Sequence, residues 1–150
     1  MYNIFMLKEK SCGAVIYKIE NNKVFYLLSI MSLGHTSLTK GHVEPGETEL
    51  ETAKREIFEE TNLKTRIDTN FRKVITYSPK NDVIKDVIFF VAKTTEEIIP
   101  EDKHDNEVID FYWLDFDEAL QKLTFESDKD VLREANNYIL KKEKIENGKL

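Results

Sequence analysis

The chain has 150 residues, of which 41% are hydrophobic and 16 are aromatic (nine Phe, six Tyr and one Trp), so we expect one domain over residues 1–150 with a substantial core. Its formal net charge of −6 disfavours a nucleic-acid partner, which needs a basic surface, and its longest apolar run, Val87–Ala92, is too short to span a membrane. The single cysteine, Cys12, excludes an internal disulfide, and the N-terminal segment lacks the features of a signal peptide, so a cytoplasmic location is expected.

The first half of the chain contains two predicted strands, a loop and a helix. The apolar segments Ser11–Tyr17 and Lys23–Met31 flank the turn-forming run Glu20-Asn21-Asn22, and this pattern predicts two paired strands. Ser32–Glu47 is predicted to be a loop. Thr48–Thr61 is predicted to be a helix, since its apolar residues recur at helical spacing.

The second half of the chain has three predicted strands, a polar acidic loop and two helices. The strands are Thr65–Ser78, Ile84–Thr94 and Val108–Leu114, the loop is Glu97–Glu107, and the helices are Asp115–Leu123 and Glu126–Lys144. Strands and helices that mix along the chain in this order predict a mixed α/β sandwich. Cys12 lies in an apolar run and is expected to be a core residue.

The first predicted helix has a clear start signal. Pro45-Gly46 is typical of a turn, Thr48 can cap the helix, and Glu51 follows three residues later as the second member of a capping box. The helix is therefore expected to begin directly after this turn.

The same helix places three carboxylates along one edge. With Glu56 as the origin, Glu59 and Glu60 lie on either side of it, within an arc of roughly 100°. An adjacent arc can pack into a core, and it contains Leu50, Ala53, Ile57 and Thr61. Crowded carboxylates usually need a cation, and oxygen ligands suit Mg²⁺ or Mn²⁺, which often share substrate phosphates. The alternative is that these carboxylates lie on a solvated helix face. Lys40-Gly41 and Arg55 lie at fixed sequence distances from the carboxylates, and this combination favours a metal site.

From Gly41 to Leu63 the chain reads GHVEPGETELETAKREIFEETNL. This segment resembles the Nudix box, G-x5-E-x7-R-E-U-x-E-E-x-G-U, in which U is aliphatic. The matching positions are Gly41, Glu47, Arg55, Glu56, Ile57, Glu59, Glu60 and Leu63. Asn62 departs from the pattern, which has glycine there. Asn tolerates a left-handed backbone better than other non-glycine residues, so the helix can still end at this position.

The resemblance implies the α/β fold of Nudix hydrolases, in which a mixed sheet lies within an α/β/α sandwich. Such enzymes hydrolyse a nucleoside diphosphate linked to another group, by attack of water on phosphorus, while Mg²⁺ (or Mn²⁺ in its place) neutralises charge. The implied metal ligands are Glu56, Glu59, Glu60 and the carbonyl of Gly41. Arg55 would orient a ligand carboxylate, with Glu47 as its partner, and the catalytic set would comprise Arg55, Glu56, Glu59 and Glu107.

Segments outside the box resemble a narrower group of the family, the asymmetric diadenosine tetraphosphate hydrolases. These segments are Lys40–Glu47, Tyr77, Lys85–Ile88, Glu107 with Trp113 six residues later, and Phe125. The resemblance implies cleavage of diadenosine tetraphosphate to ATP and AMP, with Tyr77 and Phe125 stacked on an adenine. Glu107 would be a further metal ligand or the general base. The implied phosphate-binding residues are Lys40, Lys85 and His42.

Several alternatives stay open at this point. Tyr77 and Phe125 can instead be packing residues, Glu107 is one of several acids in its loop, and His42 can be a plain surface residue. The segment His35–Thr39 lacks the tryptophan and prolines that the diadenosine tetraphosphate hydrolases usually carry there, which leaves the base pocket open.

The function has alternatives as well. One is a Nudix pyrophosphatase that acts on nucleoside triphosphates, nucleotide sugars or RNA 5′ ends. Another, of a different class, is a catalytically idle module that senses a nucleotide. The sequence leaves open the number of metal ions, the identity of the general base and the oligomeric state.

Overall fold

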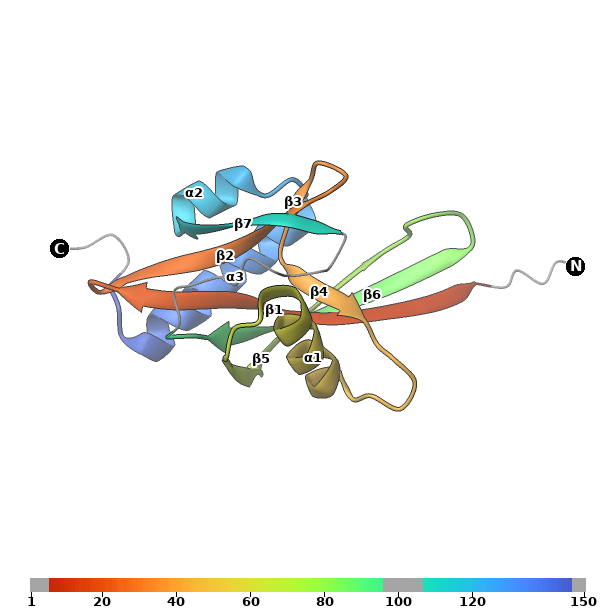
Figure 1. The fold of residues 1–150 in the computed structure, drawn as a ribbon, viewed down its shortest axis with the longest axis horizontal. Coiled ribbons are helices and arrows are strands. Elements are labelled where there is room, and N and C mark those ends of the chain that lie inside the picture. The colour runs from red at the N-terminus through yellow and green to blue at the C-terminus, as the bar shows by residue number, and fades with distance from the viewer. Residues whose placement is uncertain (1–5, 96–106, 147–150) are drawn as a thin grey trace, which may run out of the picture.

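The structure is a computed structural model that describes residues 6–95 and 107–146. The described residues form seven strands and three helices (Figure 1). In chain order they are β1 (Leu7–Glu20), β2 (Lys23–Met31), β3 (Thr36–Ser37), β4 (Thr39–His42), α1 (Glu49–Thr61), β5 (Arg66–Tyr77), β6 (Val83–Lys93), β7 (Val108–Asp115), α2 (Phe116–Lys122) and α3 (Glu126–Glu143). No described helix is both long enough and apolar enough to cross a membrane.

The strands form one mixed sheet in the order β3-β2-β1-β6-β5. β1 and β6 run parallel, and the other pairs are antiparallel. On its other edge, β1 has two partners in turn. Residues 11–14 pair with β4, and residues 17–20 pair with β2. β2 therefore diverges from β1 at the end where β4 enters the sheet, and this is where the site is built.

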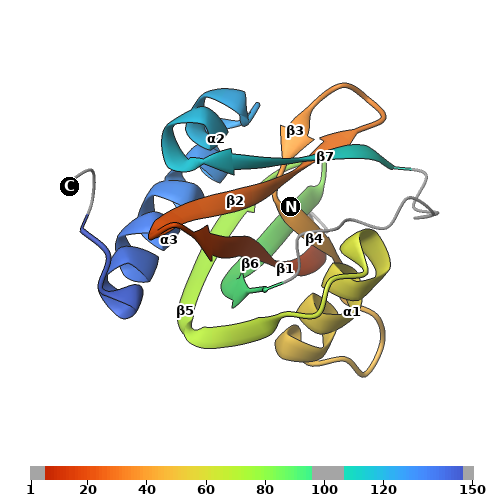
Figure 2. The ribbon, with the colours of Figure 1, turned by 60° about the vertical axis from the view of Figure 1, so that its left-hand side comes forward.

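The sheet is covered by helices on both faces (Figure 2). Along β1 the side chains alternate between these faces, as expected for a strand. Val15 and Tyr17 belong to a cluster that includes Val131, Leu132, Ala135 and Ile139 of α3. Ala14 and Ile16 belong to a second cluster that includes Ala53 and Ile57 of α1. The expected α/β/α arrangement around a mixed sheet is confirmed, and Cys12 is a fully buried core residue as predicted.

Most predicted elements lie within one or two residues of the observed ones, but two predictions are wrong. β1 runs from Leu7 to Glu20 rather than from Ser11 to Tyr17, because residues 7–10 pair with residues 83–86 of β6 and residues 18–20 pair with β2. The segment Ser32–Glu47 is not entirely a loop, since it contains β3 and β4. These two strands are too short and too polar to be recognised from the sequence. The predicted loop Glu97–Glu107 lies outside the described residues except for Glu107.

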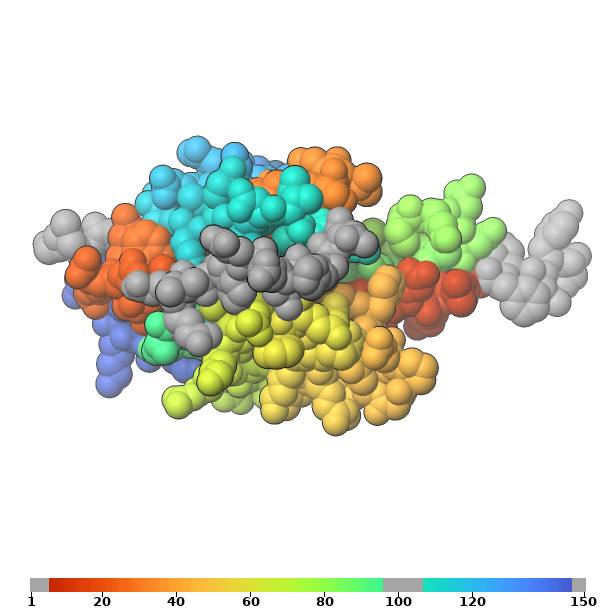
Figure 3. All heavy atoms as spheres, in the orientation of Figure 1, coloured from red at the N-terminus to blue at the C-terminus, as the bar shows by residue number. Residues whose placement is uncertain are grey.

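The start of β1 and the hairpin between β5 and β6 form a projecting arm. In Figures 1 and 3 this arm extends beyond the body of the molecule on the side where the chain begins. Tyr77 and Lys85 are paired across this hairpin. The arm therefore carries two of the candidate substrate-binding residues to the edge of the site.

Candidate functional site

Helix α1 begins and ends as its sequence predicts. The hydroxyl of Thr48 accepts a hydrogen bond of 3.1 Å from the Glu51 amide, and the Glu51 carboxylate accepts one of 2.8 Å from the Thr48 amide, which completes the capping box. At the other end Asn62 adopts a left-handed conformation with φ of 56° and donates its amide to the Phe58 carbonyl at 2.8 Å. Asn62 thus ends the helix in place of glycine.

Arg55 lies at the centre of a charge network between α1 and the preceding loop. Its guanidinium donates two hydrogen bonds to the Glu47 carboxylate, at 2.7 and 3.0 Å, and a third to the His42 carbonyl at 2.8 Å. The bonds from Arg55 hold the pKa of Glu47 at about 2, well below its usual range. The predicted pairing of Arg55 with Glu47 is present, and it ties the turn before α1 to the helix.

The same guanidinium also reaches along the helix to two of the candidate metal ligands. Its Nη1 donates to Glu59 at 3.0 Å and to Glu56 at 3.3 Å. Glu56 and Glu60 are buried, with 9% and 5% of their surface exposed, whereas the Glu59 side chain is largely exposed. Buried carboxylates are costly unless a cation or hydrogen-bond donors compensate them, and Arg55 is one such cation for Glu56.

Gly41 brings the backbone of β4 against this edge. A Cβ atom built on Gly41 would lie 1.9 Å from an Oε atom of Glu56, so no other residue fits there without displacing the carboxylate. Gly13 on β1 has the same role on the other side, since its Cβ would lie 1.8 Å from the Thr39 carbonyl oxygen. Two glycines therefore allow β1, β4 and α1 to approach closely.

A small cavity of about 90 Å³ opens where β4 leaves β1. It is lined by Ser11, Met31, Ser37, Leu38, Lys40, Gly41, His42, Glu60, Lys85 and Glu107. Six of these were predicted as site residues from the sequence, although they come from β4, α1, β6 and the residue before β7. The structure thus brings together Lys40, Gly41, His42, Glu60, Lys85 and Glu107.

Lys85 is affected by its burial in the cavity and by the charges around it. Burial lowers the pKa of Lys85, and the positive charge of Lys40 lowers it further. The negative charges of Glu9 and Glu107 raise the pKa of Lys85. A pair of cations in this setting is suited to an anion that can contact both, and a polyphosphate is such an anion.

Tyr77 and Phe125 are not among the residues that line the cavity. Tyr77 is 41% exposed and Phe125 is 50% exposed, so neither is a core residue. Phe125 precedes α3 and packs against the His35 ring, with 5.5 Å between the ring centroids. Tyr77 pairs with Lys85, which shares the face of β6 that also carries Val87. Two exposed aromatic rings, one of them paired with Lys85, are suited to stacking on a base.

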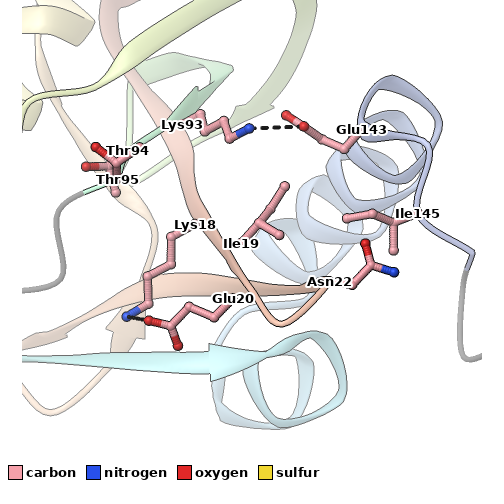
Figure 4. A pocket seen from close by; sticks show the side chains of 9 residues that line it. All are labelled: Lys18, Ile19, Glu20, Asn22, Lys93, Thr94, Thr95, Glu143 and Ile145. Carbon is pink, nitrogen blue, oxygen red and sulfur yellow. Dashed lines mark hydrogen bonds and ion pairs between the residues drawn. The ribbon is translucent and has the colours of Figure 1, made fainter.

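A second and larger hollow lies at the other end of β1 (Figure 4). Its volume is about 460 Å³, and it is lined by Lys18, Ile19, Glu20, Asn22, Lys93, Thr94, Thr95, Glu143 and Ile145. Its lysines are already engaged, since Lys93 pairs with Glu143 at 3.0 Å and Lys18 with Glu20 at 3.2 Å. It contains none of the predicted site residues, so size alone does not identify the functional site.

Four residues that line the cavity were missed from the sequence, namely Ser11, Met31, Ser37 and Leu38. Ser11 lines the small cavity, and its buried hydroxyl has no hydrogen-bond partner among the described residues. Asp128 is buried in the first turn of α3 and interacts electrostatically with Lys40 and Tyr77. A serine in a strand and an acid at a helix start are common in sequences, so only the tertiary arrangement distinguishes these two.

The donor set around α1 fits a divalent cation that shares its coordination with a substrate. Within residues 6–95 and 107–146, no three His, Cys, Asp or Glu side chains form a preassembled metal cage. Glu56 and Glu60 nonetheless offer buried carboxylates beside the close approach of Gly41. Mg²⁺ is commonly held by one or two carboxylates, several waters and substrate phosphates, so a partial protein shell is what this ion requires.

Comparisons with known proteins agree with this architecture. The family model described as NUDIX domain matches residues 11–135. The asymmetrical bis(5′-nucleosyl)-tetraphosphatases of Rattus norvegicus and Sus scrofa are each 33% identical to the chain over 141 residues, covering 87% of this chain and 95% of theirs. The crystal structure of a Caenorhabditis elegans Ap4A hydrolase binary complex superposes with a TM-score of 0.78 at 26% identity, covering 87% of this chain and 97% of that one. The chain therefore belongs to the Nudix family and is a Nudix hydrolase.

Proposed function

We propose that the protein hydrolyses dinucleoside polyphosphates in the presence of Mg²⁺ and cleaves diadenosine tetraphosphate to ATP and AMP. One observation carries the proposal: Lys40, Lys85, Glu60 and Glu107 share one cavity, and the exposed Tyr77 is the strand partner of Lys85. This arrangement suits a ligand that has several phosphates and a base. The similarity to two proteins named asymmetrical bis(5′-nucleosyl)-tetraphosphatases supports the same substrate class.

The metal-binding role is assigned to the edge of α1. Glu56, Glu59 and Glu60 with the Gly41 carbonyl would hold Mg²⁺, which would neutralise phosphate charge. Mn²⁺ has the same preference for oxygen ligands and would substitute for Mg²⁺. Arg55 keeps Glu56 and Glu59 in position through its hydrogen bonds of 3.3 and 3.0 Å.

The remaining groups bind and orient the substrate. Lys40, Lys85 and His42 contact the phosphate chain, and the rings of Tyr77 and Phe125 stack on an adenine. Glu107 accepts the proton of the attacking water, whose oxygen forms a new bond to phosphorus while the bridging P–O bond breaks. One water is consumed, and the products are AMP and ATP.

A product assay tests this proposal. The purified protein is incubated with Mg²⁺ and diadenosine tetraphosphate, and the nucleotides are separated by ion-exchange chromatography. Equal amounts of AMP and ATP are expected. Two molecules of ADP, or no product beside rapid hydrolysis of nucleoside triphosphates or nucleotide sugars, would contradict the assignment. Binding of nucleotides without any turnover would instead favour a sensing module.

A further inference from the structure

Ser11 carries a buried hydroxyl group that the proposed chemistry does not use. The residue is 1% exposed, and its Oγ atom has no hydrogen-bond partner among the described residues. Such a group is costly, because its hydrogen bonds to water are lost on folding and are not replaced. Ser11 lines the small cavity of about 90 Å³, so its hydroxyl is available to a group that enters there.

The strand pairing places Ser11 between two lysines. On β4, Ser11 lies opposite His42, and Lys40 lies two residues before His42. On β6, Ser11 lies opposite Val87, and Lys85 lies two residues before Val87. Residues that lie opposite each other in paired strands, and residues two positions from them, project from the same face of a sheet. Lys40 and Lys85 therefore flank Ser11 on one face, and all three residues line the cavity.

We propose that Ser11 is a substrate-binding residue whose hydroxyl donates a hydrogen bond to a phosphate oxygen held between Lys40 and Lys85. This inference rests on the proposed function and extends it, since it adds a neutral donor to the phosphate site. The contact involves no proton transfer, so it contributes to binding rather than to bond cleavage.

The size of the cavity selects a phosphate group rather than a nucleoside. Pockets for drug-sized ligands usually measure about 300–1,000 Å³, whereas this cavity measures about 90 Å³. Because a water molecule takes up about 30 Å³ in the liquid, the cavity has room for about three waters or for one phosphate group. A base and its ribose have to lie outside it.

The charges around Ser11 favour a phosphate over trapped water. Lys40 and Lys85 attract an anion, whereas a buried water needs only polar partners. Glu60 and Glu107 also line the cavity and repel a phosphate. Under the proposed function, Glu60 binds a divalent cation, which offsets part of this repulsion. A neutral hydroxyl strengthens phosphate binding without adding another charge to the cavity.

Ser29 provides a matched control. It lies on the neighbouring strand β2, is also 1% exposed, and has an Oγ atom without a hydrogen-bond partner among the described residues. It is not one of the residues that line the cavity. Ser11→Ala and Ser29→Ala each remove a buried hydroxyl that stabilises nothing in the ligand-free protein, so neither variant should have a lower Tm than wild type.

Calorimetric titration with a nucleotide analogue tests the inference. The ligand is α,β-methylene-ADP in the presence of Mg²⁺, because its bridging carbon prevents hydrolysis between the phosphates. Ser11→Ala should bind this ligand at least about tenfold more weakly than wild type, the loss expected for a hydrogen bond to a charged acceptor. Ser11→Cys should show a similar loss, since a thiol fills the space of the hydroxyl but is a weak donor. Ser29→Ala should retain the wild-type affinity.

Adenosine is the matched ligand control, because it has no phosphate. Its affinity should be the same for wild type and Ser11→Ala. Unchanged affinity of Ser11→Ala for α,β-methylene-ADP, full affinity of Ser11→Cys, an equal loss with adenosine, or absence of α,β-methylene-ADP binding to wild type would each overturn the inference. A Tm of Ser11→Ala below that of wild type would also overturn it, since the hydroxyl would then support the fold.

This readout is distinct from the product assay. Cleavage of diadenosine tetraphosphate to AMP and ATP, together with unchanged binding by Ser11→Ala, would leave the proposed function standing and remove the role of Ser11. Weaker binding of α,β-methylene-ADP by Ser11→Ala and Ser11→Cys alone, without that cleavage by wild type, would do the reverse.

Discussion

The guanidinium of Arg55 binds the carboxylate of Glu47 through two hydrogen bonds, at 2.7 and 3.0 Å. This contact joins the turn before α1 to the middle of the helix, eight residues further along the chain. The guanidinium of Arg55 donates a third hydrogen bond to the His42 carbonyl at 2.8 Å, and this bond fixes the end of β4 as well. The helix edge, the turn and β4 are therefore held together by one side chain.

Replacing Arg55 with lysine should impair catalysis while the fold persists. Lysine keeps the charge but cannot form the planar fork to Glu47, so Glu56 and Glu59 would lose their shared donor. We expect kcat to fall at least tenfold, or about 1.4 kcal/mol in activation free energy. Steady-state kinetics with diadenosine tetraphosphate as the substrate measures this change in kcat. An exposed matched control is Arg133→Lys on α3, for which unchanged kinetics is expected; equal rates for Arg55→Lys and wild type would contradict the prediction.

The contribution of Glu47 to stability should depend on pH. Its pKa is about 2 in the folded protein because of Arg55, below the value of about 4.3 for an unperturbed Glu. A depressed folded pKa means that the stabilisation is fully present above the unfolded pKa and is lost as pH falls from about 4.3 towards about 2. The Tm difference between wild type and Glu47→Gln should therefore be largest at neutral pH and shrink below pH 4.3. A difference that is constant from pH 7 to pH 3 would refute this assignment.

Gly41 should not tolerate even alanine. The added Cβ would lie 1.9 Å from the Glu56 carboxylate, so this carboxylate must move away from β4 and from its hydrogen bond with Arg55. We expect Gly41→Ala to lower the Tm and to reduce turnover strongly. Thermal unfolding of Gly41→Ala in a Glu56→Ala background gives the control, since removal of the carboxylate should restore most of the lost stability. If the Tm loss is the same in both backgrounds, the contact with Glu56 is not its cause.

The exposed rings should contribute to affinity rather than to folding. Tyr77→Ala and Phe125→Ala should each weaken substrate binding by about 1–3 kcal/mol, the usual value of a stacked base. A rise in KM with little change in kcat is expected, together with an unchanged Tm, because both rings are about half exposed.

Tyr112 provides the matched control for this pair. It is a tyrosine of similar exposure, 38% against 41% for Tyr77, and lies on β7 near Lys122. Tyr112→Ala should leave KM unchanged. Loss of folding in Tyr77→Ala with unaltered affinity would support a packing role for that ring.

The sequence is informative wherever a local rule decides the structure. The capping box of Thr48 and Glu51, the left-handed Asn62 and the packing arc of Ala53 and Ile57 all depend on residues within a few positions of one another. Helical spacing and turn chemistry are local properties, so these features could be predicted.

The rest of the site depends on contacts between distant segments. β4 is a strand only because residues 39–42 pair with residues 11–14 of β1. The burial of Asp128 depends on where α3 meets the sheet, and Ser11 lines the cavity only because β4 leaves β1 there. Nothing within a few residues of Ser11 or Asp128 indicates these contacts. The arrangement of the carboxylates along α1 was accordingly easier to predict than the walls of the cavity.

The central claim is that the carboxylates of α1 hold a divalent cation for phosphoanhydride cleavage. The most direct measurement is the initial rate of diadenosine tetraphosphate cleavage as Mg²⁺ is titrated, for wild type and for Glu60→Gln, with Glu134→Gln on the exposed face of α3 as the control. We predict no cleavage in the presence of EDTA, and at saturating Mg²⁺ a turnover at least ~10²-fold lower in Glu60→Gln than in wild type and the control. Full activity of wild type in EDTA, or unchanged turnover of Glu60→Gln, would contradict the claim.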